Sequence, residues 1–262
     1  MKYKISLLII LVSLMGSAHA KKKILDTKKL KRAKIYRSLK VALQKPRKVY
    51  KLYLYGQDLK SLSPEIKSLK RLQMLDLTEN RLTTLPKEVA KLKRLQWLNL
   101  TENKLTVLPK QIGKLKRLEW LGLSENRLTT VPKGIGKLKK LESLNLSENR
   151  ITHLPKKIGK LKKLLWLSLW DNQLTRLPKK IGKLKGLNWL HLDKNELTRI
   201  PKTIGNLKNL KHLGLSENRL TKLPKEIGNL QSLKTLNLWG NNFSEKEMKK
   251  IRKLLPKCDI TF

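Results

Sequence analysis

An asparagine returns every 23 residues along most of this 262-residue chain, with no residue gained or lost between one return and the next. It stands at Asn80, Asn103, Asn126, Asn149, Asn172, Asn195, Asn218 and Asn241. Leucines at fixed offsets surround each asparagine, and the stretch 72–86 is the first full instance. A fixed period of this length is typical of a solenoid, in which each repeat forms one structural unit that stacks on the next. We therefore expect a stack of similar rungs rather than one central core.

Each repeat changes its hydrophobic period halfway along. Leu98 and Leu100 alternate with Trp97 and Asn99, which is the period-two pattern of a short strand with its leucines facing inward. After Pro109 the apolar residues fall at roughly helical spacing. The predicted fold is an α/β solenoid in the form of a curved horseshoe. A parallel sheet lines its concave face, short helical turns line its convex face, and helical caps close both ends.

The repeated asparagines predict a structural ladder. An amide side chain both donates and accepts hydrogen bonds, so it can pair with backbone groups where the chain turns away from the sheet. Stacked once per rung, these amides are expected to form a continuous buried column.

The chain divides around nine repeats that span 49–243, of which the first is atypical and the last is truncated. Apolar residues at helical spacing predict an N-terminal helical cap at 35–48, which Pro46 brings to an end. A C-terminal helical cap is expected at 244–262. Ser244 followed by Glu247 has the spacing of a capping box, and Ile260 should lie behind that helix.

The N-terminus has the pattern of an export signal. Lys2 and Lys4 precede an apolar run at 5–15, and Ala18-His19-Ala20 supplies a small-x-small cleavage site. We expect 1–20 to be a signal peptide that is cleaved after Ala20, followed by a basic segment at 21–34. The mature protein is then secreted, or held at the cell surface or in the periplasm.

Two recurring segments place the chain beside a known family. They are Leu-Pro-Lys-x-Ile-Gly-x-Leu-x-x-Leu and Leu-x-Leu-x-x-Asn-x-Leu, and with 36–44 and 239–244 they resemble the 23-residue leucine-rich repeats of secreted Leptospira proteins. The resemblance covers essentially the whole mature chain. It implies an exported or surface-exposed protein that binds host components and has no enzyme activity. This chain departs from such relatives in carrying Lys where they often carry Gln or Glu.

Tryptophan is confined to outward-facing strand positions. All six Trp of the chain fall in two rows of the predicted concave face and none in the leucine core. Because neighbouring strands lie ~4.8 Å apart, Trp97 should stack on Trp120, and Trp166 on Trp189. Cross-strand stacking that shields the sheet is one interpretation, and a protein-binding surface is the other. The candidate partner-binding residues are Met74, Trp97, Trp120, Trp166, Trp170, Trp189, His212 and Trp239.

Positive charge concentrates on the predicted convex face. The chain has 61 Lys and Arg against 19 Asp and Glu, a formal net charge of +42. Columns of lysine recur at the repeat period, and a charge this dense attracts polyanions, although it also keeps a leucine-rich chain in solution. The candidate polyanion-binding residues are Lys87, Lys110, Lys133, Lys156 and Lys179.

No catalytic residues, cofactor site or metal site are predicted, since the chain has no nucleophile–base pair, phosphate-binding loop or metal-ligand motif. His191 and His212 lie near Asp193, but without the spacing of a zinc site. The sequence favours a secreted, non-catalytic protein that recognises a protein partner through its concave face. The alternative is an adhesin that binds sulfated glycans or other anionic surfaces through its convex lysines. The ligand and the oligomeric state stay open.

Overall fold

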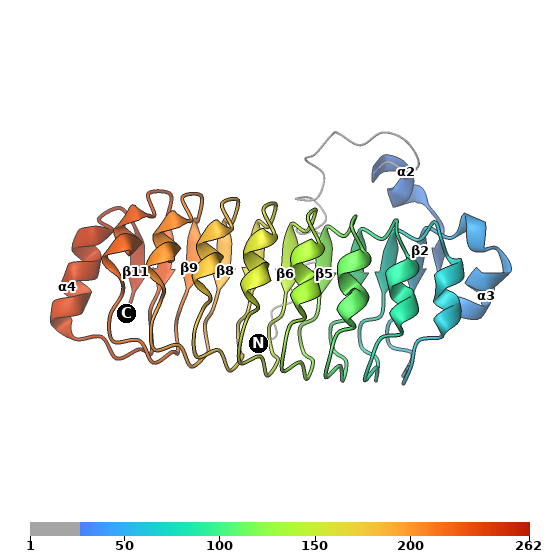
Figure 1. Ribbon diagram of the computed structural model, residues 1–262, viewed down its shortest axis with the longest axis horizontal. Coiled ribbons are helices and arrows are strands. Elements are labelled where there is room, and N and C mark those ends of the chain that lie inside the picture. The colour runs from blue at the N-terminus through green and yellow to red at the C-terminus, as the bar shows by residue number, and fades with distance from the viewer. Residues whose placement is uncertain (1–26) are drawn as a thin grey trace.

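The computed structural model describes residues 27–262, which form one elongated stack of rungs. Figure 1 shows short helical turns along one side of the stack and the sheet behind them, with α3 (Leu39–Gln44) at one end and α4 (Glu245–Leu254) at the other. The predicted signal peptide at 1–20 lies outside the described residues, as does the start of the basic segment at 21–34. The remainder of that segment contains a third helix, α2 (Thr27–Arg32).

A single parallel sheet of 11 strands follows the order of the sequence from β1 to β11. The strands are β1 (Ile35–Tyr36), β2 (Lys51–Tyr53), β3 (Met74–Asp76), β4 (Trp97–Asn99), β5 (Trp120–Gly122), β6 (Ser143–Asn145), β7 (Trp166–Ser168), β8 (Trp189–His191), β9 (His212–Gly214), β10 (Thr235–Asn237) and β11 (Asp259–Thr261). Each repeat pairs in register with the next, so that Leu98 faces Leu121. The inward leucines therefore stack into one core along the whole molecule.

The return segments are short 3-10 turns rather than α-helices. They are η1 (Pro46–Lys48), η2 (Pro64–Ser68), η3 (Lys87–Lys91), η4 (Lys110–Lys114), η5 (Lys133–Lys137), η6 (Lys156–Lys160), η7 (Lys179–Lys183), η8 (Lys202–Asn206) and η9 (Lys225–Asn229). A proline precedes each turn from η3 to η9 with φ near −65°, the angle that its ring imposes. The predicted solenoid of strands and convex helical turns is confirmed.

The asparagine ladder is present, and Asn149 shows its pattern. The side-chain Nδ2 of Asn149 donates to the carbonyl oxygens of Leu146 and Ser147 in its own rung, at 3.2 and 2.9 Å. It also donates to the carbonyl of Leu123 in the preceding rung, at 2.9 Å. Its Oδ1 accepts from the backbone N–H of Leu128 at 2.9 Å. One amide thus satisfies four backbone groups and ties two rungs together.

The residue before most of these asparagines adopts a left-handed backbone conformation. Glu125, Glu148 and Asp171 have φ values of 53°, 52° and 52°. Only glycine takes this conformation without steric cost, and here Glu, Asp or Lys fills it. The hydrogen bonds of the following asparagine hold the turn in place.

Glycine in the turns allows neighbouring rungs to approach closely. A Cβ added to Gly136 would clash with the carbonyl oxygen of Lys157 in the next rung, and Gly159 meets the carbonyl of Lys180 in the same way. The rungs therefore stack backbone against backbone on the convex side.

Both ends of the sheet differ from the predicted caps. Helical spacing predicted a helical cap from residue 35, but Ile35 and Tyr36 form β1 and pair with β2, and α3 begins only at Leu39. At the other end Ile260 belongs to β11, which extends the sheet beyond the last repeat. The cap regions thus contribute one edge strand each as well as a helix, because a strand satisfies backbone groups that a helix packed on the end would leave unpaired.

The C-terminal helix docks onto the last full repeat, which starts at Leu210, through its first turn. Ser244 Oγ accepts a hydrogen bond of 3.3 Å from the backbone N–H of Glu247, as predicted for a helix N-cap. The Glu247 carboxylate accepts from the backbone N–H of Leu223 at 3.2 Å. Across residues 27–262, no helix is both long enough and apolar enough to cross a bilayer.

Candidate functional site

The outward side of the sheet, which we call the concave face, presents three rows of side chains. The first row begins each strand and contains Met74, Trp97, Trp120, Ser143, Trp166, Trp189, His212 and Thr235. The second row ends each strand and runs from Tyr53 to Asn237. The third row follows each strand and includes Trp170, Asp193 and Trp239.

The first part of this face holds a buried aromatic cluster. Met74, Trp97 and Trp120 expose only 9%, 7% and 6% of their surfaces. The rings of Trp97 and Trp120 stack with their centroids 4.8 Å apart and their planes 15° from parallel, as predicted. These three outward-facing residues are therefore not exposed, because Leu30 of α2 and Tyr53 pack against the cluster.

Two local contacts fix the cluster. The ring of Trp120 lies over Gly122, where an added Cβ would clash with it. Lys51, on the first row of β2, donates from Nζ to the carbonyl oxygen of Lys31 at 2.9 Å, which ties α2 to the sheet. Burial lowers the pKa of this lysine.

The second part of the concave face carries exposed indoles. Trp189 exposes 40% and Trp239 exposes 55% of its surface, while Trp166 and Trp170 are half-buried. Trp189 stacks on His212 with centroids 3.6 Å apart and planes 12° from parallel. Within the described residues the ring of Trp166 contacts His191 instead, at 6.2 Å, so the predicted stack of Trp166 on Trp189 is wrong.

Polar groups between these indoles are held in fixed positions. Asp193 Oδ1 accepts from the backbone N–H and the hydroxyl of Ser216, at 3.0 and 2.7 Å. Its carboxylate lies over Gly214, where any Cβ would clash with it. Burial lowers the pKa of His191 and the Asp193 charge only partly opposes that shift, so the imidazole is neutral at neutral pH. This part of the face offers flat apolar rings beside hydrogen-bonding groups.

The concave face is almost free of lysine. The only Lys, Arg, Asp or Glu side chains in its three rows, from β2 to β10, are Lys51, Asp76 and Asp193. The chain has a net charge of +42, but almost none of its lysines and arginines lie on the concave face. A polyanion would therefore bind the concave face less favourably than the rest of the surface. Within residues 27–262, no group of three or more metal-ligating side chains lies close enough together to hold an ion.

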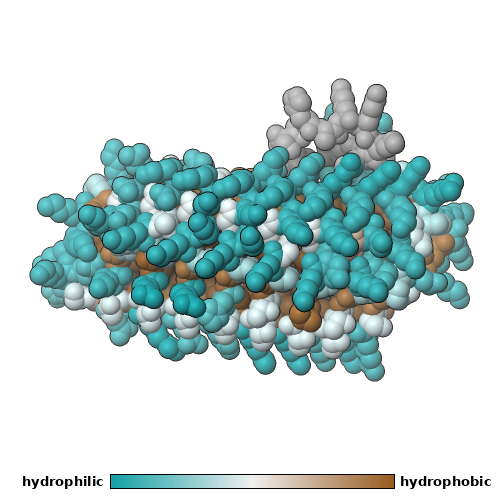
Figure 2. Space-filling view, viewed as in Figure 1, coloured by the Kyte–Doolittle hydropathy of each residue, from teal (hydrophilic) through white to brown (hydrophobic). Residues whose placement is uncertain are grey.

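The convex face carries the lysines (Figure 2), where hydrophilic side chains cover most of the turns. A first column opens the turns and is exposed throughout: Lys87, Lys110, Lys133, Lys156, Lys179, Lys202 and Lys225. A second column follows at Lys91, Lys114, Lys137, Lys160 and Lys183, and is also exposed. These columns correspond to the predicted convex charge.

A further column of lysines forms hydrogen bonds to the next rung. Lys162 Nζ donates to the carbonyl of Lys183 at 2.9 Å, and Lys185 Nζ donates to the carbonyl of Asn206 at 3.0 Å. The column consists of Lys93, Lys116, Lys139, Lys162, Lys185 and Lys208. Each ammonium lies at the C-terminal end of a neighbouring turn, where unpaired carbonyls favour a cation. We call these residues the capping lysines.

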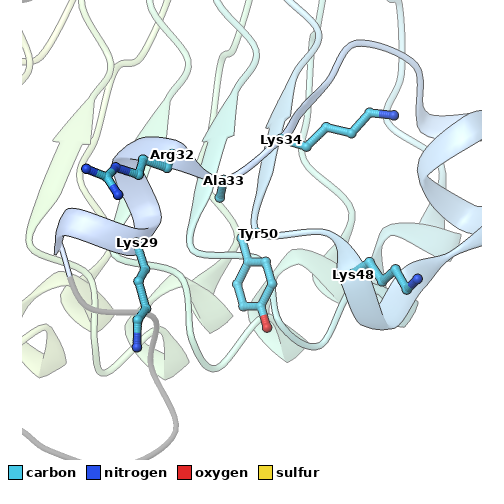
Figure 3. Close-up of a pocket in the computed structure, with 6 residues that line it drawn as sticks. All are labelled: Lys29, Arg32, Ala33, Lys34, Lys48 and Tyr50. Carbon is cyan, nitrogen blue, oxygen red and sulfur yellow. The ribbon is translucent and has the colours of Figure 1, made fainter.

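A small hollow lies beside α2 (Figure 3). It is open to solvent, has a volume of about 400 Å³, and is lined by Lys29, Arg32, Ala33, Lys34, Lys48 and Tyr50. Figure 3 shows that Lys34 and Lys48 point one way, Arg32 the other, and Lys29 along Tyr50. Because the cations do not converge, the hollow is not a built anion site.

The capping lysines and the position of α2 were not predicted from the sequence. The repeat period marked the lysines but not their acceptors, since backbone carbonyls leave no trace in a residue pattern. Leu30 is the one apolar residue of α2, and that isolated side chain was the only signal that the helix packs against something.

Comparison with known proteins points to one repeat family. Models described as "Leucine-rich repeat region" match residues 109–192 and 133–213. Models described as "Leucine rich repeat" match residues 47–105, 70–128 and 185–243. The comparison with curated protein sequences gave no match.

Several solved structures are similar to this chain. An LRR protein of Leptospira interrogans is 30% identical over 87% of this chain and 100% of its own, with a TM-score of 0.44. The plant peptide hormone receptor RGFR1, solved in complex with RGF2, is 35% identical over 73% of this chain and 32% of its own, with a TM-score of 0.66. An internalin of Listeria monocytogenes is 21% identical over 88% of this chain and 74% of its own, with a TM-score of 0.70, and supports the fold alone.

Proposed function

This chain belongs to the leucine-rich repeat proteins, and from that premise we propose that it is an exported, non-catalytic binding protein that recognises a protein partner with its concave face. Repeat solenoids commonly present an extended sheet face to their ligands, and the plant receptor above was solved with a bound partner. A host component is the partner that export and the resemblance to Leptospira proteins favour. Export itself rests on the sequence pattern at 1–20.

The observation that carries the proposal is the exposed aromatic strip around Trp189 and Trp239. Large exposed rings in a contiguous patch are unusual on a surface without a partner. Tryptophan is also among the residues that contribute most at the centres of protein interfaces. Asp193 and the neutral His191 lie beside the rings, so that a polypeptide can pair its backbone groups as well as pack against them.

The test uses two matched sets of tryptophan variants. In one, Trp166, Trp170, Trp189 and Trp239 become Ala, and in the other Trp97 and Trp120 become Ala. The mature protein is used to capture partners from host-cell surface extracts at moderate and at high salt. We expect the first set to lose a partner that survives high salt while its thermal unfolding stays near that of the parent. Unchanged capture by the first set would rule out the exposed strip as the site.

A second candidate is binding of a polyanion by the convex lysines. It is favoured by the first column, which is exposed throughout, whereas the capping lysines are already bound to carbonyls. Retention on heparin should then fall steeply with salt and be lost when Lys110, Lys133, Lys156 and Lys179 become Gln. If removal of 21–34 alone abolishes retention, the basic N-terminal segment is the site and the columns are not.

A further inference from the structure

Helix α2 is too short to be stable by itself. It has 6 residues, with no acidic residue in its first turn, and isolated helices below ~12 residues are marginal in water. Its sequence is Thr-Lys-Lys-Leu-Lys-Arg, so Leu30 is its only apolar side chain. The helix therefore depends on the contacts that it makes with the sheet.

Two of those contacts lie on the concave face. Leu30 packs against the cluster of Met74, Trp97 and Trp120, and the carbonyl of Lys31 accepts the hydrogen bond from Lys51. Figure 3 shows the segment that carries Lys29 and Arg32 crossing in front of the first strands. The chain's own N-terminal segment thus occupies one part of the face that we propose binds a partner.

The covered part of the face leaves polar groups without partners. The Trp120 Nε1–H is buried in the cluster, and both polar atoms of the Gln73 side chain are buried one residue before Met74; none of them forms a hydrogen bond within residues 27–262. Burial of an unpaired donor or acceptor costs about 1–3 kcal/mol, so this arrangement is poorly compensated. A ligand that accepted a hydrogen bond from the Trp120 indole would bind this part of the face more strongly than α2 does.

We propose that α2 is a displaceable occupant of the concave face, and that the partner segment which replaces it is a cationic stretch of polypeptide with one aliphatic anchor residue. The cationic character follows from α2 itself, whose Leu30 is flanked on both sides by lysines. It also agrees with the surroundings, because the covered rows carry only the bonded Lys51 as a cation. A carboxylate column, which includes Glu79, Glu125, Glu148 and Asp171, follows the third row of the same face. The inference rests on the proposed function of this face and deepens it.

The first experiment asks whether α2 covers the cluster in solution. Leu30→Asp removes the anchor in the full mature chain, and Leu30→Met is the matched control that keeps an apolar side chain. Indole N–H signals, assigned by single Trp→Phe variants, are followed by NMR with a soluble paramagnetic quencher. We expect several-fold faster relaxation of Trp97 and Trp120 in the Asp variant alone, with Trp189 and Trp239 unchanged. If the Trp97 and Trp120 signals relax equally in the parent and both variants, α2 does not cover the cluster in solution and the proposal is wrong.

A second variant protects this result against a folding defect. Lys51→Met removes the hydrogen bond to Lys31 while keeping the length of the buried side chain. This variant should expose the indoles of Trp97 and Trp120. The side-chain amide signals of the asparagine ladder should stay unchanged, which would show that the stack is still folded. Faster relaxation of all six indoles than in the parent would mean that the sheet itself had opened and would contradict the proposal.

The second experiment supplies the occupant in trans. The probe is a synthetic peptide of residues 27–34, used at millimolar concentration because a short tether gives an effective concentration of that order. If the cover is closed nine-tenths of the time, the Leu30→Asp protein should bind the peptide about tenfold more tightly than the parent does. The same peptide with Asp in place of Leu should not bind. Equal binding of both peptides would show a purely electrostatic contact and overturn the aliphatic anchor.

The two proposals fail separately. Neither experiment uses a natural partner, so the peptide can bind the uncovered cluster even if no host protein is ever captured through Trp189 and Trp239. Conversely, capture that is unaffected by Leu30→Asp, together with unchanged indole exposure, would leave the proposed function standing and eliminate the displaceable helix.

Discussion

The ammonium group of Lys139 donates a hydrogen bond of 3.0 Å to the backbone carbonyl of Lys160, one rung further along the solenoid. Burial of the ammonium, and then repulsion by neighbouring lysines such as Lys160 and Lys116, lowers the pKa of Lys139. A position that looks like excess surface charge therefore links two rungs. It follows that net charge alone overstates how many lysines are available to a polyanion.

Replacing a capping lysine should weaken the stack. Lys139→Met loses one hydrogen bond to a turn carbonyl, and we expect stability to fall by about 0.5–1 kcal/mol. For a chain of this size that corresponds to a Tm lower by about 2 °C in calorimetry. Lys137→Met is the control, since its ammonium forms no hydrogen bond within residues 27–262. Equal shifts for both variants would contradict the capping role.

Replacing an asparagine of the ladder should destabilise the protein most in the middle of the stack. Asn149→Leu leaves the buried backbone N–H of Leu128 unpaired, at a cost of about 1–3 kcal/mol if no water replaces the amide. It also removes one of the two hydrogen bonds that the carbonyl of Leu146 accepts. Asn241→Leu should cost less, because Asn241 is partly exposed at the last rung. Urea titration of the two variants measures the difference. The reverse order would show that the ladder does not depend on burial.

A methyl group should be tolerated at one glycine and not at another. Gly136→Ala forces a Cβ against the carbonyl of Lys157, and overpacking of this kind costs about 1–3 kcal/mol. Gly186→Ala meets its nearest atom at 3.4 Å and should be neutral or slightly stabilising. The Tm of each variant is measured by thermal unfolding. A lower Tm for Gly136→Ala alone would show that the close approach of the rungs is the cause, and not the loss of a glycine in general.

The carboxylate column predicts a stability that rises in mild acid. Burial, and then repulsion by Glu125 and Asp171, raises the pKa of Glu148 above its usual 4.5. A carboxyl group with a higher pKa in the folded chain binds more protons when folded than when unfolded. Its contribution is therefore fully present below the unfolded pKa and is lost as pH rises through the folded pKa.

Glu148→Gln tests that effect directly. The variant should be more stable than the parent at neutral pH, by less than about 1 kcal/mol because the group is partly exposed. The gain should shrink as pH falls through the folded pKa of Glu148 toward 4.5, and it should change no further below that pH. A constant gain at every pH would point to the left-handed backbone at this position instead of the charge.

The repeat architecture could be predicted from the sequence because its two periods are written in residue types. Leucines mark the strand and turn positions, and the asparagines mark where each rung turns. The edge strands β1 and β11 could not be predicted, since they lie outside the repeat and their residues also fit a helix or a tail.

The candidate site was predicted only in its residue types. The rows were placed correctly, because strand alternation fixes which side each residue faces. Burial within a row was not predicted. Trp97 and Trp189 occupy the same repeat position, but Trp97 belongs to a cluster against which Leu30 and Tyr53 pack. The contact of Leu30 joins segments far apart in the sequence, and no local pattern encodes it.

The hydrogen bonds of the asparagine ladder never reach beyond the adjacent rung, and their spans are fixed by the repeat length. Asn103 bonds Leu77, 26 residues earlier, and Leu82, 21 residues earlier. A gene for this protein can therefore grow or shrink by whole repeats, through recombination between similar units, with every remaining amide finding an equivalent partner. An insertion one codon shorter or longer would break the ladder at that point. The uniform spacing of the rungs is what such a history of duplication would leave behind.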